Sequence, residues 1–390
     1  MRIIVQKFGG TSLASREGRN MAIDKVICAV EQGYRPVVVV SAMGRKGDPY
    51  ATDSLLSLIN NKECKIEKRE VDLLMSCGEI ISAVVMAEAF AERGYKTRVL
   101  TGGNAGIITD DNFGNASVIK VEAEMVLKVL EQGLIPIITG FQGMTEEGDY
   151  TTLGRGGSDV TGALLGKALN AEYVEIYTDV DGIMTADPNI VPNARIIDRI
   201  DYREVFQLAY QGAKVIHPRA VEFALENNIP LIVKNTFSDA PGTVITNLVE
   251  YEDNLFTGVT SMTNKAMVIV KDGDIPKLLT DKKISIDIIS EIQDQKVFIV
   301  DSDAAVEVEN ILKQLNIEYR IINNCCKIFL IGNNISGMQE VMSKLVRTLE
   351  VNNVNVLQIA NSHKTICCLI EEADNKKALN ELHRAFFCAS

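Results

Sequence analysis

The 390-residue sequence contains no tryptophan, only three histidines and nine prolines, and aromatic residues make up 6% of it. The three histidines have no metal-ligand spacing, so nothing in the sequence indicates a zinc site. None of the eight cysteines belongs to a Cys-x-x-Cys pair. We therefore expect reduced thiols rather than a disulfide framework, which is typical of cytoplasmic proteins.

Long apolar runs and an excess of positive charge are also missing. No apolar run approaches the ~20 residues of a membrane span, and the strand pattern before Gly9 is too short for a signal peptide. The net charge of −12 argues against binding to duplex DNA or to an anionic membrane surface. An anionic ligand would need local basic residues, for which Lys7, Arg155 and Lys214 are candidates. We expect a cytoplasmic protein with no nucleic-acid or membrane partner.

The first two thirds of the chain alternate short apolar strand patterns with amphipathic helix patterns. This alternation predicts an α/β fold with a mostly parallel sheet covered on both faces. Strands are expected at 3–8, 36–40, 97–100, 135–139, 173–177 and 229–233, and helices at 52–59, 70–92 (interrupted at 77–79), 118–131, 202–210 and 219–227. Turns that follow strands, at Gly9, Ser41, Gly140, Thr178 and Asn235, should gather at one sheet edge, where such folds bind ligands.

A glycine-rich turn at 151–159 precedes an apolar helix pattern. A helix N-terminus of this kind collects N–H donors and positive dipole, so it favours an anion. We expect Ser158 to be the N-cap, and Arg155 to add donors for a carboxylate or phosphate. A second turn, Gly9-Gly10, lies beside Lys7, whose ammonium group suits a phosphate. Neither turn is a Walker sequence, so a P-loop NTPase is disfavoured, whereas two such turns favour phosphoryl transfer.

Several acidic residues and one histidine have two interpretations. Glu79 is either a solvated helix residue or a group that binds an ammonium ion. Asp159, Asp179 and Asp181 either have a functional role, orienting a lysine or holding Mg²⁺ through water, or serve as helix N-terminal charge (Asp159) and turn residues (Asp179 and Asp181). His217 precedes Pro218 at an expected helix start, which favours a structural role.

After about residue 247 the pattern changes to strand, helix, strand, strand, helix, strand, and it occurs twice, over 266–322 and 327–387. Each unit is a βαββαβ arrangement, and the chain reaches its end before the last strand of the second. The strand-like segment 255–260 is expected to complete that second unit. Paired units of this kind expose sheet edges that favour pairing with a partner subunit.

Six motifs, in this order, resemble the successive signatures of aspartate kinases: 7–12, 76–79, 154–159, 178–182, 187–188 and 214–218. The resemblance implies an amino acid kinase fold, a three-layer sandwich around a mostly parallel sheet, over residues 1–246. It implies a linker and donated strand at 247–262, a first ACT unit at 263–324 and a second at 325–390. No homoserine dehydrogenase module follows, so a monofunctional enzyme is expected.

The resemblance also implies the reaction: the γ-phosphoryl group of MgATP passes to the side-chain carboxylate of L-aspartate, giving 4-phospho-L-aspartate. This would be the first step of the aspartate pathway to lysine or diaminopimelate, threonine and methionine, with feedback from an amino acid at the ACT units. Lys7 would stabilise the transferring phosphoryl group and Asp159 would position it. Arg155 would bind the α-carboxylate of aspartate and Glu79 its amino group, while Thr52, Gly156 and Ser158 complete the pocket.

The nucleotide site implied by the resemblance consists of Lys7, Gly9, Gly10, Ser41, Thr178, Asp179, Asp187, Lys214 and Val215, with no side chain bound directly to Mg²⁺. Met184 stands where the family often has tyrosine, which removes one nucleotide contact.

The segment 359–364 is similar to that of the Bacillus-type aspartate kinase that responds to meso-diaminopimelate. This favours that effector, with lysine second, bound near Asp274, Glu291, Asn361 and Ser362. Two alternatives remain open: a kinase for another amino acid carboxylate or UMP, and a catalytically inactive or weak amino acid sensor.

Overall fold

The structure is a computed structural model that describes the chain outside residues 60–64, 214, 248–255, 272–274, 283, 293–294, 334, 336–338 and 389–390. The chain forms two compact units, which are described separately. The first comprises Met1–Ile183, Ile196–Ala209 and Lys214–Glu250, and the second comprises Met184–Arg195, Tyr210–Ala213 and Tyr251–Ser390.

The first unit is built on an eight-stranded sheet of order β10-β12-β11-β9-β1-β2-β6-β3. The strands are β1 (Ile3–Phe8), β2 (Arg35–Val40), β3 (Thr97–Leu100), β6 (Ile135–Thr139), β9 (Val174–Thr178), β10 (Arg199–Ile200), β11 (Leu231–Asn235) and β12 (Thr243–Ile245). All neighbouring pairs are parallel except β11 with β12. The predicted mostly parallel sheet is therefore confirmed, with β1 buried along its whole length between β2 and β9.

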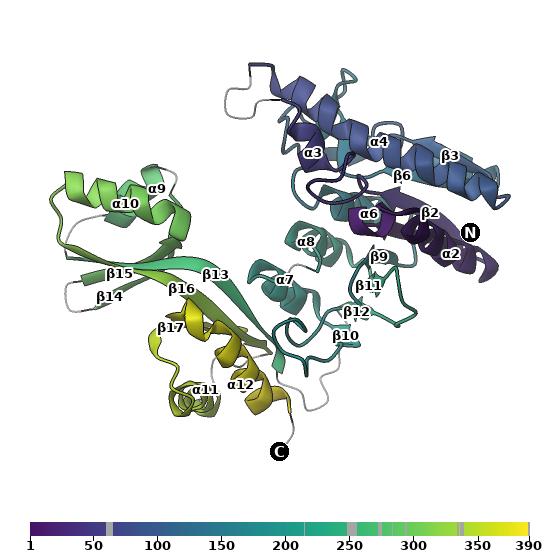
Figure 1. Ribbon diagram of the computed structural model, residues 1–390. Helices are drawn as coiled ribbons and strands as arrows, with labels where there is room; N and C mark the ends of the chain where they lie inside the picture. Colours follow the sequence, from purple (N-terminus) through teal and green to yellow (C-terminus); the bar gives the residue numbers. More distant parts are fainter. Residues whose placement is uncertain are drawn as a thin grey trace. The chain divides into compact units, whose positions relative to one another are not determined.

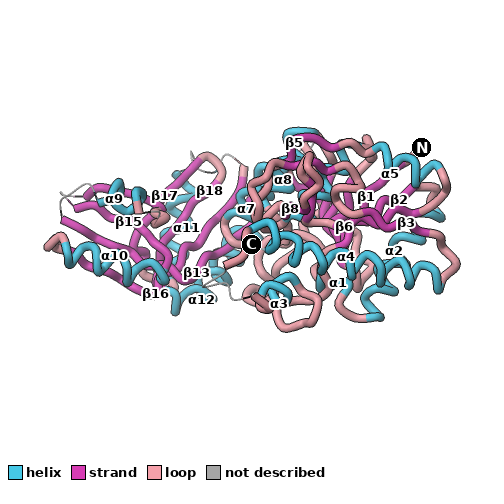
Figure 2. Tube along the Cα trace, turned by 90° about the horizontal axis from the view of Figure 1, so that it is seen from above, coloured by secondary structure: helices cyan, strands magenta, loops and turns pink. Residues whose placement is uncertain are grey.

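Helices cover both faces of this sheet, giving three layers (Figures 1 and 2). On one face α2 (Arg16–Glu31) and α4 (Lys68–Glu92) bury a core that includes Phe8, Ile137 and Phe90. On the other face α6 (Gly157–Ala168) packs closely, because a Cβ at Gly166 would lie 2.5 Å from a methyl of Val174. The remaining helices are α1 (Gly10–Leu13), α3 (Thr52–Leu56), α5 (Glu124–Glu131), α7 (Tyr202–Tyr210) and α8 (Pro218–Asn227).

Two sequence predictions about this unit are wrong. Helix α4 is continuous through Gly78. The glycine does not break the helix but allows close packing, since a Cβ there would lie 2.8 Å from that of Ala42. The expected helix at 118–131 begins instead with a strand, β5 (Val118–Val121), which pairs antiparallel with the segment just before it in sequence, from Ile107 to Thr109. A second sheet of order β5-β4-β7-β8 results, and its strands β4 (Ile107–Thr109), β7 (Gln142–Met144) and β8 (Tyr150–Thr152) were not predicted.

By length and composition, α4 is the one described helix that could cross a membrane. Its buried face includes Asp72, Glu79, Ala83, Met86 and Phe90, and the last three pack on the sheet. Core helices of globular folds share this length and composition, and these contacts place α4 in the core of the first unit.

The second unit contains a six-stranded sheet of order β14-β15-β13-β16-β18-β17. Its strands are β13 (Phe256–Lys271), β14 (Asp287–Ile292), β15 (Gln295–Asp301), β16 (Tyr319–Gly332), β17 (Val356–Ser362) and β18 (Thr365–Glu371). The first half of β13 pairs with the second half of β16, and its second half pairs with β15. The segment before residue 262 therefore supplies the missing strand of the second repeat, as predicted, and the two repeats share β13 and β16 as continuous strands.

Two helices cover the sheet in each repeat: α9 (Ile275–Asp281) and α10 (Ser302–Gln314), then α11 (Gln339–Val351) and α12 (Asn375–Phe387). Phe298 is central to the first core and Leu345 to the second. The seven described cysteines are free thiols. Burial raises the pKa of Cys367 and of Cys368 to about 12, so these thiols stay protonated and unreactive.

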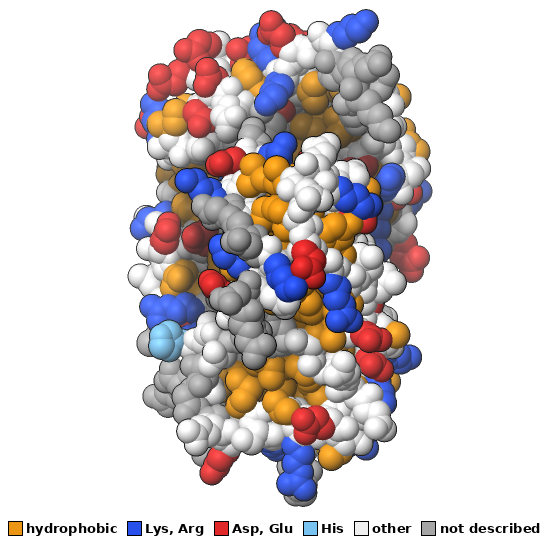
Figure 3. Space-filling view, turned by 90° about the vertical axis from the view of Figure 1, so that its left-hand side faces the viewer, with side chains coloured by type: hydrophobic (Ala, Val, Ile, Leu, Met, Phe, Trp, Pro, Cys, Tyr) orange, Lys and Arg blue, Asp and Glu red, His pale blue; other side chains and the backbone are white. Residues whose placement is uncertain are grey.

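The edge strands of this sheet carry exposed hydrophobic side chains, Ile289 on β14 and Ile359 on β17. On the face of the molecule shown in Figure 3, hydrophobic side chains lie among charged ones across the middle of the surface. An open sheet edge with apolar side chains is a surface on which another chain can pair.

Candidate active site

The turns that follow β1, β2, β6 and β9 meet at one edge of the sheet, as predicted, because these strands are parallel neighbours. Backbone hydrogen bonds join them: Gly9 N–H donates to the Tyr177 carbonyl (3.1 Å) and Gly44 N–H to that of Gly10 (2.9 Å). A Cβ at Gly10 would lie 2.6 Å from the carbonyl oxygens of Ala42 and Gly44. The turn after β1 and the loop after β2 thus form one continuous surface.

Lys7 and Asp159 form the central ion pair of this edge. The Lys7 Nζ lies 2.6 Å from Asp159 Oδ1, and both side chains are nearly buried, with 11% and 13% exposed. Asp159 is in the first turn of α6, and its other oxygen accepts a hydrogen bond from the His217 N–H at 3.3 Å. Asp159 therefore fixes the direction of the Lys7 ammonium group, and this ion pair links β1 to the N-terminus of α6.

The turn before α6 differs from the prediction at its cap. The N-cap is Gly156, with φ of +71°, and not Ser158. A Cβ at position 156 would lie 2.1 Å from Cγ of His217, so only glycine fits against this ring. The Nδ1 of His217 in turn accepts from the Arg219 N–H and caps α8, which agrees with the predicted structural role. Burial lowers the pKa of His217, so its ring is neutral near pH 7.

Glu79 is 2% exposed and lies on α4, where its Oε1 accepts a hydrogen bond from the Ala42 N–H at 3.1 Å. Its Oε2 has no hydrogen-bond partner within the described part of the chain. Burial raises the pKa of Glu79 to about 8, despite the opposing effect of backbone hydrogen bonds. An unpaired buried carboxylate oxygen is costly unless a ligand supplies the donor, which favours the ammonium-binding interpretation.

A group that the sequence analysis missed supports the turn containing Arg155. Asp72 is fully buried on α4 and accepts hydrogen bonds from Thr152 N–H (2.7 Å), Thr152 Oγ1 (2.9 Å) and Gly114 N–H (2.9 Å). From the other side, Arg219 donates to the Leu153 carbonyl at 2.6 Å. Arg155 itself is exposed, so its guanidinium is free to meet a ligand. In the sequence, the one sign of a role for Asp72 was its spacing from Glu79, because two helical turns place both residues on the same face of α4.

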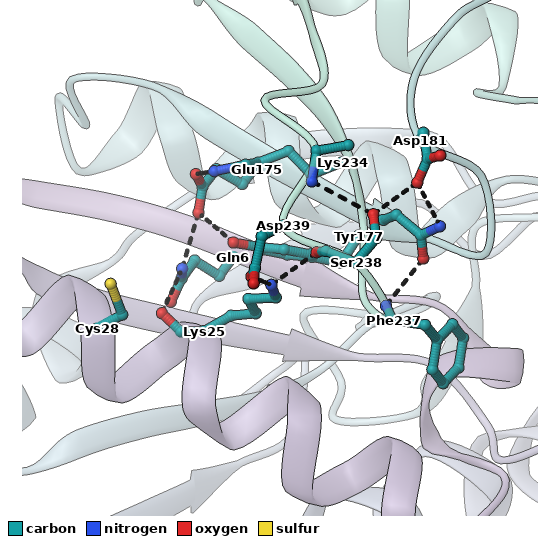
Figure 4. Close-up of polar contacts among 12 residues, drawn as sticks. Gln6, Lys25, Cys28, Glu175, Tyr177, Asp181, Lys234, Phe237, Ser238 and Asp239 are labelled. Atoms are coloured by element: carbon teal, nitrogen blue, oxygen red, sulfur yellow. Dashed lines mark hydrogen bonds and ion pairs between the residues drawn. The ribbon is translucent and has the colours of Figure 1, made fainter.

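The two acidic residues after β9 have different partners. Asp179 forms an ion pair with Arg45 of the loop after β2. Asp181 accepts hydrogen bonds from Asn235 and Ser238 (Figure 4), which lower its pKa and hold the loop after β11. The turn interpretation therefore holds for Asp181.

The same view shows a second polar group beneath this edge, centred on the buried Glu175. It accepts from Gln6 Nε2 at 2.7 Å, Tyr177 OH at 3.1 Å and Lys234 Nζ at 3.1 Å (Figure 4). These contacts join β1, β9 and β11 below the turns and hold the strand ends in register.

The other predicted residues divide by location. Ser41, Thr52 and Ser158 lie with the residues above in the first unit, as do Thr178 and Val215. Lys214 and Asp274 lie outside the described residues. Asp187 belongs to the second unit, where its carboxylate accepts from the N–H and side-chain amide of Asn189. The predicted effector residues Glu291, Asn361 and Ser362 are exposed on edge strands β14 and β17.

The fold and this edge define a kinase of the amino acid kinase family, whose sequence model matches residues 2–235; an ACT domain model matches residues 328–386. The chain is 42% identical to aspartokinase 1 of Bacillus subtilis over 400 residues, covering 99% of both chains. It is 36% identical to the aspartokinase of Geobacillus stearothermophilus, covering 99% of this chain and 97% of that one. Within the amino acid kinase family, the chain belongs to the aspartokinases.

Solved structures of aspartokinases have the same fold over nearly the whole chain. Escherichia coli aspartokinase III in complex with aspartate and ADP matches with a TM-score of 0.76 and 26% identity, covering 99% of this chain and 100% of that one. The same enzyme with lysine and aspartate, in its T-state, matches with a TM-score of 0.78 over 99% of both chains.

Proposed function

We propose that this enzyme phosphorylates the side-chain carboxylate of L-aspartate with MgATP. The observation that carries the proposal is the juxtaposition, at one sheet edge, of the paired Lys7 with an unpaired buried Glu79 oxygen. The first suits a phosphoryl group and the second suits a substrate ammonium group. A relative with this fold binds aspartate and ADP together.

In the proposed reaction, a side-chain carboxylate oxygen of aspartate attacks the γ-phosphorus. The bond from that phosphorus to the β–γ bridging oxygen breaks, and ADP leaves with the electron pair. No protein nucleophile is needed, so the enzyme contributes positioning and charge stabilisation. Lys7 neutralises charge on the transferring group, with Asp159 holding the ammonium in place. Arg155 binds the α-carboxylate of aspartate and Glu79 its ammonium, with Thr52, Gly156 and Ser158 around them.

The nucleotide would be held by residues of the first unit: Gly9, Gly10, Ser41, Thr178, Asp179, Lys214 and Val215. The close approach of backbone at Gly10 leaves a surface of peptide groups without side chains, which suits a polyphosphate chain. Among the described residues no three acidic, histidine or cysteine side chains cluster to hold a metal ion. We propose, as the resemblance implies, that no side chain binds Mg²⁺ directly and that the phosphates carry the ion, which would neutralise their charge.

We further propose that the enzyme works in the cytoplasm on the aspartate pathway, with domain boundaries at 1–246, 247–262, 263–324 and 325–390. The effector would be meso-diaminopimelate, or lysine, which aspartokinase III of Escherichia coli binds in its T-state. The open edges of β14 and β17 support a homo-oligomer formed through the ACT units.

The test is aspartate-dependent ADP formation with MgATP, trapping the acyl phosphate as its hydroxamate. We expect hydroxamate with aspartate, suppressed by meso-diaminopimelate more than by lysine or threonine. Lys7→Ala should bind nucleotide but lose about 10²- to 10³-fold in turnover. Nucleotide binding without any hydroxamate would instead favour another carboxylate substrate or the sensor interpretation.

A further inference from the structure

Arg45 lies at the active edge but was not a candidate in the sequence analysis. Its guanidinium pairs with the carboxylate of Asp179, and within the described part of the chain this is the one ion pair of Arg45. Arg45 follows β2, whereas Asp179 follows β9. In the sheet these two strands are separated by β1.

This order determines where the ion pair runs. Neighbouring strands lie about 4.8 Å apart, so the ends of β2 and β9 are separated by about 10 Å. A pair that joins their following loops must cross the end of β1, which is the Gly9-Gly10 turn beside Lys7. The Arg45–Asp179 pair therefore passes over the surface on which the phosphates are proposed to lie.

The backbone of the loop is held in place. Gly44 donates to the Gly10 carbonyl and has φ of +89°, a left-handed conformation that turns the chain back over the sheet. The Arg45 N–H donates to Asp48 Oδ2 at 2.7 Å, and the Gly47 N–H donates to Ser54 Oγ at 3.2 Å. The Arg45 side chain, 71% exposed, thus extends from an ordered loop.

The position of the loop after β2 indicates which phosphate of the nucleotide Arg45 would bind. Two residues before Gly44, the Ala42 N–H binds Glu79, the proposed site of the substrate ammonium group. The loop therefore lies between the acceptor pocket and the Gly9-Gly10 turn. A guanidinium on this side approaches the terminal phosphate rather than the phosphates nearer the nucleoside.

We propose that Arg45 is a further catalytic residue, which leaves Asp179 when MgATP binds and donates to the γ-phosphate opposite Lys7. The inference rests on the proposed phosphoryl transfer. Asp159 already neutralises Lys7 in part, so a further cation beside the proposed Mg²⁺ and Lys214 would add to the stabilisation of charge on the transferring group. The exchange also frees the carboxylate of Asp179 for its own part in nucleotide binding.

The experiment compares Arg45→Ala and Arg45→Lys with Lys46→Ala, a matched control that removes the adjacent exposed positive charge. An ion pair as exposed as Arg45–Asp179 contributes little to stability, so all three variants should fold, with unfolding midpoints close to that of the wild type. We expect Arg45→Ala to lower kcat/KM for MgATP at least about tenfold. Arg45→Lys should recover part of this loss, because lysine keeps the positive charge but lacks the planar, bidentate donors of the guanidinium group. Lys46→Ala should stay within about twofold of the wild type.

Binding provides the second measurement, using MgADP and a non-hydrolysable MgATP analogue. Arg45→Ala should weaken the analogue about tenfold and leave MgADP within about twofold, because only the analogue has a γ-phosphate. Equal weakening of both nucleotides, or wild-type turnover in Arg45→Ala, would overturn the inference. If Lys7→Ala is inactive while Arg45→Ala is normal, only the role of Arg45 fails. If both are normal, the proposed active site itself fails.

Discussion

Replacing Glu79 by glutamine should change the pH dependence of stability in a way that the structure specifies. The glutamine oxygen can still accept the hydrogen bond from the Ala42 N–H, so the packing is retained. Only the titration is removed. Burial raises the pKa of Glu79 from 4.5 to about 8 in the folded protein. The folded state therefore favours the protonated form, and the glutamate's contribution to stability is greatest at low pH and is lost as pH rises from 4.5 to 8.

The magnitude follows from the shift. One pKa unit corresponds to about 1.4 kcal/mol, so between pH 5 and pH 7 the wild type should lose on the order of 2 to 3 kcal/mol relative to Glu79→Gln. All other groups titrate in both proteins and cancel in the difference. The assay is denaturant unfolding of both proteins at pH 5, 6, 7 and 8 without substrate. A difference in unfolding free energy that does not change with pH would refute the argument.

The same carboxylate predicts how aspartate binding depends on pH. A substrate ammonium group favours the ionised carboxylate, so binding should release a proton and the affinity for aspartate should rise with pH up to about 8. Glu79→Gln should bind aspartate about 10- to 100-fold more weakly, with no such rise. Calorimetry in buffers of different ionisation enthalpy measures the proton release directly, and its absence in the wild type would contradict a role for Glu79 in binding the ammonium group.

Three other substitutions test the support of the site and of the second unit. Asp72→Ala removes the acceptor of the buried Thr152 N–H and hydroxyl, and that of the Gly114 N–H in an exposed turn. The substitution should cost about 1–3 kcal/mol of stability and raise KM for aspartate more than for MgATP, whereas Asp72→Asn should be close to wild type in both measurements. Gly156→Ala forces a Cβ against His217 and should cost about 1–3 kcal/mol, while Gly47→Ala, at a similarly left-handed but open position, should cost less in the same unfolding assay. Phe298→Ala empties the first core of the second unit and should lower its stability by about 3–5 kcal/mol; a loss below 1 kcal/mol would show that this core is not as packed as described.

The elements that the sequence determined are those whose signals are local. The buried run of β1, the turns at Gly9 and Thr178, and the His217-Pro218 start of α8 each combine a short apolar pattern with the turn or cap residues beside it. The second-unit repeat was visible for the same reason. The motifs around Lys7 and Asp159 predicted both partners of the central ion pair, and the parallel order of the strands then brought them to one edge.

Tertiary structure alone decided the features that depend on distant partners. Gly78 lies within the continuous helix α4, where the missing side chain makes room for Ala42 of the loop after β2. Gly156 rather than Ser158 is the N-cap of α6, and the ring of His217 lies against Gly156. The short strands of the second sheet form two local antiparallel pairs, β4 with β5 and β7 with β8, and they make one sheet only because β4 pairs with the more distant β7. Asp72 binds Thr152, 80 residues away, and Arg45 binds Asp179, 134 residues away, and no local pattern encodes such a contact. The residue types needed for the chemistry could therefore be identified from the sequence, whereas the contacts that position and orient those side chains depend on the tertiary structure.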